Sequence, residues 1–316
     1  MNSENTIVFS TPDSMYFAEK IAKQLGVPVG KIVISQFSGG ETYRRLDIES
    51  RTSLFGKDVI FVGSTHSDQN IDSVYDFGCA LAQYGTRQRI FIVPFLGYST
   101  MERGVKIGEV VKAKTVMRKF SSIPNSRMGN IFLFMDLHVS GLIHYMEGDC
   151  VRFELYAEEI LLDAIRKQKI QTPFVFGSAD LGRTKWVKTF AKAFETNLVL
   201  IDKGREGERV TVDEVIGNVS GKHVVVYDDM ARSANSLIEG AEAYLSRGAL
   251  SVGAVISHFA ANDLDVVERI EHSPLKFFIT TNTHPMSQIA QVQKSEKFIV
   301  ADVSNIFAMQ IMKLLR

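Results

Sequence analysis

The sequence has few cysteines, no excess of either charge and no apolar run of membrane-spanning length, and each absence excludes a class of protein. Cys79 and Cys150 are too few for a disulfide framework and lack the spacing of a metal site. Lysine plus arginine (36) equals aspartate plus glutamate (36), so no global field attracts nucleic acid or an anionic membrane. The opening residues MNSENTIVFS carry neither the basic nor the apolar region of a secretory signal. We therefore expect a soluble, cytoplasmic protein with no nucleic-acid or membrane partner.

What the sequence does contain is an ordinary globular composition, with 45% hydrophobic and 23% charged residues. A chain of 316 residues is long enough for two domains with cores of their own. Because the net charge is zero, any anionic substrate must be attracted by local clusters of charge.

The most informative stretch is GKHVVVYDDMARSANSLIEGAEAYLSRGA, at 221–249. Its valine run predicts a buried parallel strand that ends in two carboxylates, Asp228 and Asp229. A small polar loop, 232–236, and an amphipathic helix that stops at Gly248 follow. This order favours an anion site at the carboxyl end of a sheet, suited to a sugar phosphate. The alternative is an acidic turn and helix cap without a binding role.

The same unit occurs twice in the chain. GKDVIFVGSTHSDQNIDSVYDFGCALAQYGTRQRIFIVPF from Gly56 and the stretch from Gly221 both run Gly-Lys, apolar strand, polar loop, helix, glycine and apolar strand. The repeat predicts an α/β fold of two similar domains, each with a mainly parallel sheet flanked by helices. We place them at 1–153 and 154–303, with a closing helix at 304–316 that packs back on the first.

Two further segments carry candidate chemistry. The apolar run at 131–135 ends in Asp136-Leu137-His138, and GSADLG places Asp180 in a loop before a helix. DKGREGERVTVDEV at 202–215 is rich in charge and glycine and has no apolar periodicity, so we expect an exposed, mobile loop. Its basic residues either close on a polyphosphate or are simply solvated.

With these motifs in place, the chain resembles the ribose-phosphate pyrophosphokinases, the synthetases of phosphoribosyl pyrophosphate. AEKIAKQLGVPVGKIVISQFSGGETY resembles the opening region of that family, MDLH its metal-binding strand end, and KGREGE its catalytic flexible loop. ERGVKIGEV, SSIPNSR and KGREGER look closest to the plant-type second class. The resemblance covers almost the whole length and implies two phosphoribosyltransferase-type domains, ATP and ribose 5-phosphate as substrates, Mg²⁺, and a cytoplasmic homo-oligomer, either dimer or hexamer.

The resemblance also implies a reaction and a role for each matching residue. The C1 hydroxyl of ribose 5-phosphate attacks the β-phosphorus of ATP, which gives phosphoribosyl pyrophosphate and AMP. The implied roles are catalysis for Lys203 and Arg205; ribose 5-phosphate binding for Asp228, Asp229, Arg232, Ser233, Ala234, Asn235 and Ser236; nucleotide binding for Phe37, Gly39, Glu41 and Arg103; and metal binding for His138 and Asp180.

Residues 228–236 match what the resemblance implies is the ribose-phosphate loop, here called the phosphate loop. They depart from the family pattern Asp-Asp-Met-Ile-Asp-Thr-Gly-Gly-Thr. Ala234 and Asn235 replace two glycines, and alanine tolerates the left-handed backbone region poorly, whereas asparagine tolerates it better. Arg232 replaces a carboxylate and either binds phosphate or fills the site. The alternatives to an active synthetase are a degenerate paralogue that binds nucleotide or regulates a synthetase, and a phosphoribosyltransferase, which the two-domain length and the KGREGE loop disfavour.

Overall fold

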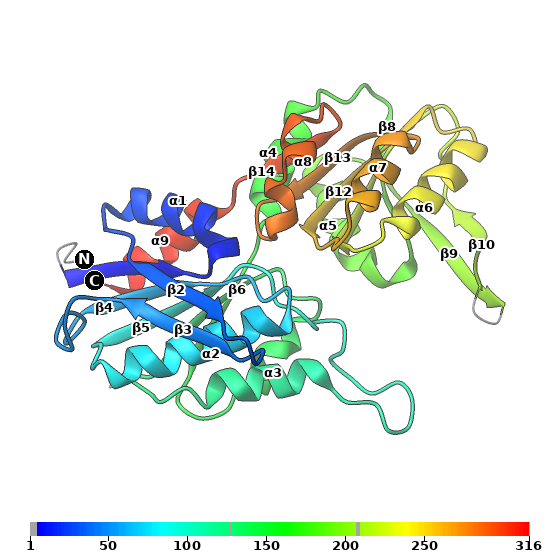
Figure 1. The fold of residues 1–316 in the computed structure, drawn as a ribbon. Coiled ribbons are helices and arrows are strands. Elements are labelled where there is room, and N and C mark those ends of the chain that lie inside the picture. The colour runs from blue at the N-terminus through cyan, green and yellow to red at the C-terminus, as the bar shows by residue number, and fades with distance from the viewer. Residues whose placement is uncertain (1–4, 127, 207–208, 316) are drawn as a thin grey trace. The chain divides into compact units, whose positions relative to one another are not determined.

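The chain folds into two α/β units, each built on its own sheet (Figure 1). A computed structural model describes residues 5–126, 128–206 and 209–315, with the backbone alone at 203–206 and 209–213. One unit comprises Met1–Tyr156 and Val303–Arg316, and the other comprises Ala157–Asp302. The expectation of an α/β fold with parallel-sheet domains is confirmed. Among the residues described, none of the helices combines the length and apolarity needed to cross a bilayer.

The first unit contains a five-stranded parallel sheet and a separate two-stranded hairpin. The sheet order is β1 (Thr6–Ser10), β4 (Asp58–Val62), β5 (Gln88–Val93), β6 (Ile131–Met135) and β7 (Val151–Leu155), and the hairpin joins β2 (Lys31–Gln36) to β3 (Thr42–Asp47). The three central strands are buried along their whole length, which explains their continuous apolar runs.

Helices cover both faces of this sheet (Figure 1). On one face lie α1 (Met15–Leu25) and α9 (Ser304–Leu314), and on the other α2 (Asp68–Gln83) and α3 (Lys112–Ser121). Phe17 of α1 meets Phe307 of α9 edge to face, with ring centroids 5.4 Å apart. On the opposite face Phe61 of β4 stacks on Phe77 of α2. The last helix of the chain is thus part of the first unit.

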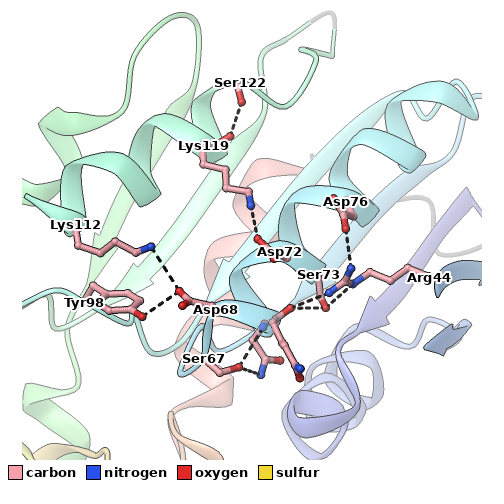
Figure 2. A network of polar contacts seen from close by, with 12 residues as sticks. Arg44, Ser67, Asp68, Asp72, Ser73, Asp76, Tyr98, Lys112, Lys119 and Ser122 are labelled. Atoms are coloured by element: carbon pink, nitrogen blue, oxygen red, sulfur yellow. Dashed lines mark hydrogen bonds and ion pairs between the residues drawn. The ribbon is translucent and has the colours of Figure 1, made fainter. Parts of the chain in front are cut away.

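The carboxylates of α2 fasten it to α3 and the preceding loop (Figure 2). Asp68 and Asp72 are four residues apart, so they share one face of the helix. Asp68 accepts a 3.0 Å hydrogen bond from the hydroxyl of Tyr98 and lies 3.6 Å from the ammonium of Lys112. Asp72 pairs with Lys119, which lies about two turns beyond Lys112 on α3.

The same helix holds the hairpin in place (Figure 2). Arg44 of β3 donates from Nη1 to Asp76 Oδ2 at 2.9 Å and from Nε to Ser73 Oγ at 3.0 Å. Both acceptors lie on α2. The orientation of the hairpin tip therefore depends on a contact made in the middle of β3.

The second unit contains a seven-stranded sheet. Its order is β10 (Arg209–Ile216), β9 (Leu198–Glu206), β8 (Phe174–Ser178), β11 (His223–Ala231), β12 (Ser251–Phe259), β13 (Leu275–Thr281) and β14 (Phe298–Ala301), and its helices are α4 (Glu158–Lys167), α5 (Thr184–Ala193), α6 (Asn235–Ser246), α7 (Leu264–His272) and α8 (Ala290–Lys294). Neighbouring strands are parallel except β9 and β10. The repeat seen in the sequence is β4–α2–β5 in the first unit and β11–α6–β12 in the second.

The segment expected to be a mobile loop at 202–215 instead forms the antiparallel ribbon of β9 and β10. Val210 pairs with Arg205, and Val212 pairs with Lys203; residues 207 and 208 lie outside the described residues. The expectation of a loop was wrong because it rested on the high charge of the segment. The β-branched run Val210-Thr211-Val212 consists of residue types that favour a strand.

The strand before the phosphate loop is also longer than its valine run indicates. β11 continues through Asp228 and Asp229 to Ala231, which pairs with Phe259 of β12. The two carboxylates therefore lie among the last residues of a paired strand, whereas the sequence predicts that the strand ends at them. Asn235 and Ser236, expected in the loop, belong to the first turn of α6.

Candidate ribose-phosphate site

The acidic pair lies at the carboxyl end of β11, where the chain turns toward α6. Ladder pairing on both sides holds this strand, to β8 as far as Tyr227 and to β12 as far as Ala231. Asp229 is buried, and Asp228 is half-buried. The backbone amide of Asp229 donates to Asp228 Oδ1 at 2.8 Å, which orients the first carboxylate. Two fixed carboxylates at such an edge can accept hydrogen bonds from adjacent hydroxyls of a sugar.

One guanidinium bridges the two carboxylates. Arg183 places Nη2 2.8 Å from Asp229 Oδ1 and Nε 3.5 Å from Asp228 Oδ1. The exposed fractions of the three side chains are small: 14% for Arg183, 16% for Asp228 and 7% for Asp229. Because little water reaches these side chains, the attraction between their charges is screened less than in a surface ion pair.

The two carboxylates differ in their electrostatic environment. Burial, and then the negative charge and hydrogen bond of Asp229, raise the pKa of the Asp228 carboxyl well above its ordinary value, and Arg183 opposes the rise. Asp180 adds a smaller effect in the same direction as Asp229. The carboxylates of this cluster thus outnumber the one guanidinium that faces the pair, and this raises the pKa of the Asp228 carboxyl.

Asp180 lies close enough to affect Asp228 and caps a short turn of its own. It follows β8, and its Oδ1 accepts a hydrogen bond from the amide of Gly182 at 2.7 Å. The cap opens the turn Leu181–Arg183, and that turn delivers Arg183 to the acidic pair. Asp180, Arg183 and the two carboxylates therefore form one cluster within the second unit.

The phosphate loop reaches α6 through a left-handed residue. Ala234 has φ 59° and ψ 3° and is buried, and it stands at the N-cap of α6. Asparagine was expected to take this conformation better than alanine, but Asn235 is helical and the alanine carries the positive φ. The backbone at Ala234 thus has the left-handed conformation that glycine adopts easily. The crowded Cβ of alanine makes this conformation cost about 1–2 kcal/mol.

The rest of the loop presents polar groups at the start of a helix. Ser233 and Ser236 are exposed, as is Arg232. Asn235 Oδ1 accepts a 2.9 Å hydrogen bond from Nη1 of Arg269 on α7. Amides at a helix start, hydroxyls and a nearby arginine together suit an anion such as a phosphate.

The predicted nucleotide residues lie in the first unit. Phe37, Gly39 and Glu41 form the turn between β2 and β3, where the amide of Phe37 donates to the carbonyl of Glu41 at 2.9 Å. The Phe37 ring is 57% exposed and meets Tyr43 edge to face. An exposed aromatic ring is able to stack on a base, and a carboxylate on the same turn is able to accept a hydrogen bond from an amino group of that base.

Two more predicted residues of the first unit stand apart from the hairpin in sequence. Arg103 lies in the loop before α3, with a side chain 80% exposed and Nε 3.4 Å from Glu102 Oε1. His138 is half-buried after β6. Buried Asp136, with φ 39°, turns the chain out of that strand. The predicted catalytic pair, Lys203 and Arg205, belongs to β9 of the second unit.

A divalent metal has few protein ligands available here. No group of three or more His, Cys, Asp or Glu side chains with metal-binding geometry occurs among the described residues. One oxygen of Asp180 accepts from Gly182, and one oxygen of each carboxylate in the acidic pair faces Arg183. Mg²⁺ often keeps several waters and binds through substrate phosphates, so the donor set fits a metal carried by a nucleotide better than a resident one.

Arg183 is the residue that sequence reasoning missed. Its signal was available: it follows Asp180 by three residues in the loop after β8, which is the neighbour of β11. Loops after adjacent parallel strands meet at the same edge of a sheet. A basic residue in one such loop and carboxylates at the end of the next strand predict an ion pair.

Comparisons with known proteins match both parts of the chain. Residues 6–123 match the family model of the N-terminal domain of ribose phosphate pyrophosphokinase, and residues 200–316 match that of the phosphoribosyl synthetase-associated domain. The crystal structure of phosphoribosylpyrophosphate synthetase from Mycobacterium smegmatis superposes with a TM-score of 0.85, at 20% identity over 98% of this chain and 99% of that one. That similarity shows a shared fold.

Two bacterial relatives extend the match over nearly full length. The ribose-phosphate pyrophosphokinase of Porphyromonas gingivalis is 29% identical over 311 residues, covering 98% of this chain and 94% of its own. That of Fusobacterium nucleatum is 28% identical over 312 residues, with the same coverage. With both family models matched in order and relatives aligned along nearly the whole chain, the protein belongs to the ribose-phosphate pyrophosphokinase family.

Proposed function

We propose that the protein is a ribose-phosphate diphosphokinase. The C1 hydroxyl oxygen of ribose 5-phosphate attacks the β-phosphorus of ATP, the bond from that phosphorus to the oxygen bridging the α- and β-phosphates breaks, and AMP leaves with the bridging oxygen. The hydroxyl proton is lost, and phosphoribosyl pyrophosphate forms. The observation that carries this proposal is the fixed acidic pair at the end of β11, followed directly by the N-terminus of α6, in a chain of this family.

The second unit supplies the sugar-phosphate contacts. Asp228 and Asp229 accept hydrogen bonds from the ribose hydroxyls. The 5-phosphate is bound by the loop amides and hydroxyls at Ser233, Ala234, Asn235 and Ser236, together with the charge of Arg232. This placement leaves the C1 hydroxyl as the reacting group, because the other ribose hydroxyls and the 5-phosphate are held by these contacts.

The nucleotide and transition-state roles complete the proposal. Phe37 stacks on adenine and Glu41 accepts from it, with Gly39 and Arg103 in the same nucleotide site. Lys203 and Arg205 stabilise charge on the transferred diphosphoryl group. His138 and Asp180 would orient the waters or phosphates of a bound Mg²⁺. When bound, Mg²⁺ neutralises phosphate charge.

The proposal extends to class and assembly. ERGVKIGEV and the KGREGER segment support the plant-type second class within the family. A cytoplasmic homo-oligomer, dimer or hexamer, follows from the same resemblance. Light scattering coupled to size-exclusion chromatography tests this part: a purely monomeric chain at working concentration contradicts it.

The direct test is AMP release from ATP with Mg²⁺, measured with and without ribose 5-phosphate. Release that depends on the sugar phosphate, and is lost in Asp228→Ala, supports the proposal. Binding of both ligands without AMP release, under varied metal, phosphate and nucleotide conditions, contradicts it.

Two observations favour a second candidate, a regulatory paralogue that binds nucleotide or a synthetase. Arg183 already contacts both carboxylates, and Ala234 strains the phosphate loop. If the natural chain releases no AMP but the combined change Arg232→Asp, Ala234→Gly and Asn235→Gly creates activity, the altered loop is the cause of inactivity and the regulatory candidate replaces the enzyme.

A further inference from the structure

One edge of the Arg183 guanidinium faces both carboxylates of the acidic pair. Nη2 lies 2.8 Å from Asp229 Oδ1, and Nε lies 3.5 Å from Asp228 Oδ1. The contact uses one planar group to reach two carboxylates, which a lysine ammonium on a flexible stem matches poorly. All three side chains are mostly buried, so water screens the charges little.

A divalent cation bound to the Oδ1 atoms of this pair would compete with Arg183 for them. Mg²⁺ and Mn²⁺ bind carboxylate oxygens directly, and one or two carboxylates with waters suffice for a site. Both Oδ1 atoms already face the guanidinium, and a cation beside it would meet a positive charge in a poorly screened environment. Asp228 Oδ1 also accepts from the Asp229 amide, which leaves it still less available.

We propose that Arg183 is the resident cation of the acidic pair and excludes divalent metal from Asp228 and Asp229. A sugar that donates its hydroxyls to these carboxylates then meets a pair whose negative charge is partly balanced by arginine, and it needs no metal ion at that place. Arg183 is a positioning residue in this sense, because it sets the charge and orientation of the groups that bind. The inference concerns the pair that the proposed function assigns to ribose, but metal exclusion is measurable without sugar, nucleotide or turnover.

The test is a Mn²⁺ titration of the full chain, followed by the electron paramagnetic resonance signal of free Mn²⁺. Arg183→Gln should gain one site that binds Mn²⁺ at least about tenfold more tightly than the natural protein, since a tenfold change needs only a modest difference in binding free energy. Adding Asp229→Asn to Arg183→Gln should abolish the gain. Arg183→Lys, which keeps the charge, should stay closer to the natural protein.

Lys185→Gln is the matched control, because it removes an exposed cation two residues away on the same segment. It should leave the titration unchanged. The inference is overturned if Arg183→Gln binds Mn²⁺ no more tightly than the natural chain, or if its gain persists with Asp229→Asn.

A second measurement does not require the Arg183 variant to fold. Asp229→Asn alone, in the natural background, should leave Mn²⁺ binding unchanged, because the pair holds no metal while Arg183 is present. If this single change weakens Mn²⁺ binding, the natural pair was already a metal site and the proposal is wrong.

Discussion

The hydroxyl of Tyr244 donates a hydrogen bond to the carbonyl oxygen of Ser178 at 2.9 Å. The bond joins α6, which follows the acidic pair, to the end of β8, which leads to Asp180. Tyr244 is fully buried, and that burial raises the pKa of its hydroxyl, so it remains a donor throughout the neutral range. One neutral contact therefore ties together the two segments that carry the acidic cluster.

Tyr244→Phe should lower the free energy of unfolding by about 1–2 kcal/mol, because a buried carbonyl loses a hydrogen bond. Gly177→Ala should also destabilise, since its Cβ would lie 2.9 Å from the Tyr244 hydroxyl oxygen. Urea unfolding of the single and double variants measures both effects. Gly177→Ala should cost less in the Tyr244→Phe background, and strictly additive losses would contradict the contact.

Asp228→Asn and Asp229→Asn should change stability in opposite directions at pH 7. The pKa of Asp228 is raised in the folded protein, so folding binds its proton more tightly, and stability falls as pH rises from about 4, the ordinary Asp value, through the raised one. Asparagine at 228 removes that loss. Asp229→Asn should instead cost about 1–3 kcal/mol, because Arg183 loses its 2.8 Å partner.

Urea midpoints from pH 4 to pH 8 measure this pair of effects. The advantage of Asp228→Asn should grow with pH and vanish near pH 4. A constant advantage, or none at pH 8, would show that the raised pKa of Asp228 has no consequence for stability.

Ala234→Gly should change the free energy of unfolding by no more than about 1 kcal/mol. The relief of the left-handed backbone is offset by a lost buried methyl group and by the freer unfolded chain. Ala234→Val should cost more than about 2 kcal/mol, since a β-branched residue fits positive φ badly. Equal stability of the valine and glycine variants in thermal unfolding would rule out strain at this position.

Lys203→Ala and Arg205→Ala should reduce turnover far more than ribose 5-phosphate affinity. If the charges act on the transferred group, they matter most in the transition state, and a loss of about 100-fold or more in kcat is expected with nearly unchanged sugar-phosphate binding. Lys185→Ala, which removes an exposed cation from the same unit, is the control. Parallel losses in binding and kcat would show that these residues already contact the bound substrate in the ground state.

Arg44→Met should raise KM for ATP several-fold and lower stability by about 1–2 kcal/mol, because Arg44 is only 12% exposed and loses its hydrogen bonds to Ser73 and Asp76. The reason is positional: Arg44 holds the hairpin that carries Phe37 and Glu41 (Figure 2). Arg45→Met is the matched control, since Arg45 points to the other face of β3 and pairs with exposed Asp47. Equal KM values for the two variants would show that the hairpin takes no part in nucleotide binding.

The elements that sequence reasoning found were those with strong apolar patterns. The runs at 58–62 and 131–135 are continuous because helices cover both faces of their sheet, and such runs identify buried parallel strands directly. The repeated strand–loop–helix–strand unit then predicted the fold class. Helix ends were found where glycine follows the apolar face, as at Gly26, which adopts the left-handed conformation with φ 66°.

What sequence reasoning missed depends on partners distant along the chain. β11 runs past Asp229 because His258 and Phe259 extend its neighbour, and no local pattern reports that pairing. The ribbon at 198–216 is held by cross-strand bonds that offset its high charge. Arg183 was missed because its meaning lies in the strand order, which places its loop beside the acidic pair.

The first unit is discontinuous in the chain, and this has a consequence for synthesis. Residues 157–302 emerge from the ribosome before α9, so the second unit can complete its core while the first still lacks the helix that brings Phe307 onto Phe17. The N-terminal residues, made first, are thus the last to be fully enclosed. A chain arrested before residue 303 should hold a protease-resistant second unit and leave α1 open to cleavage.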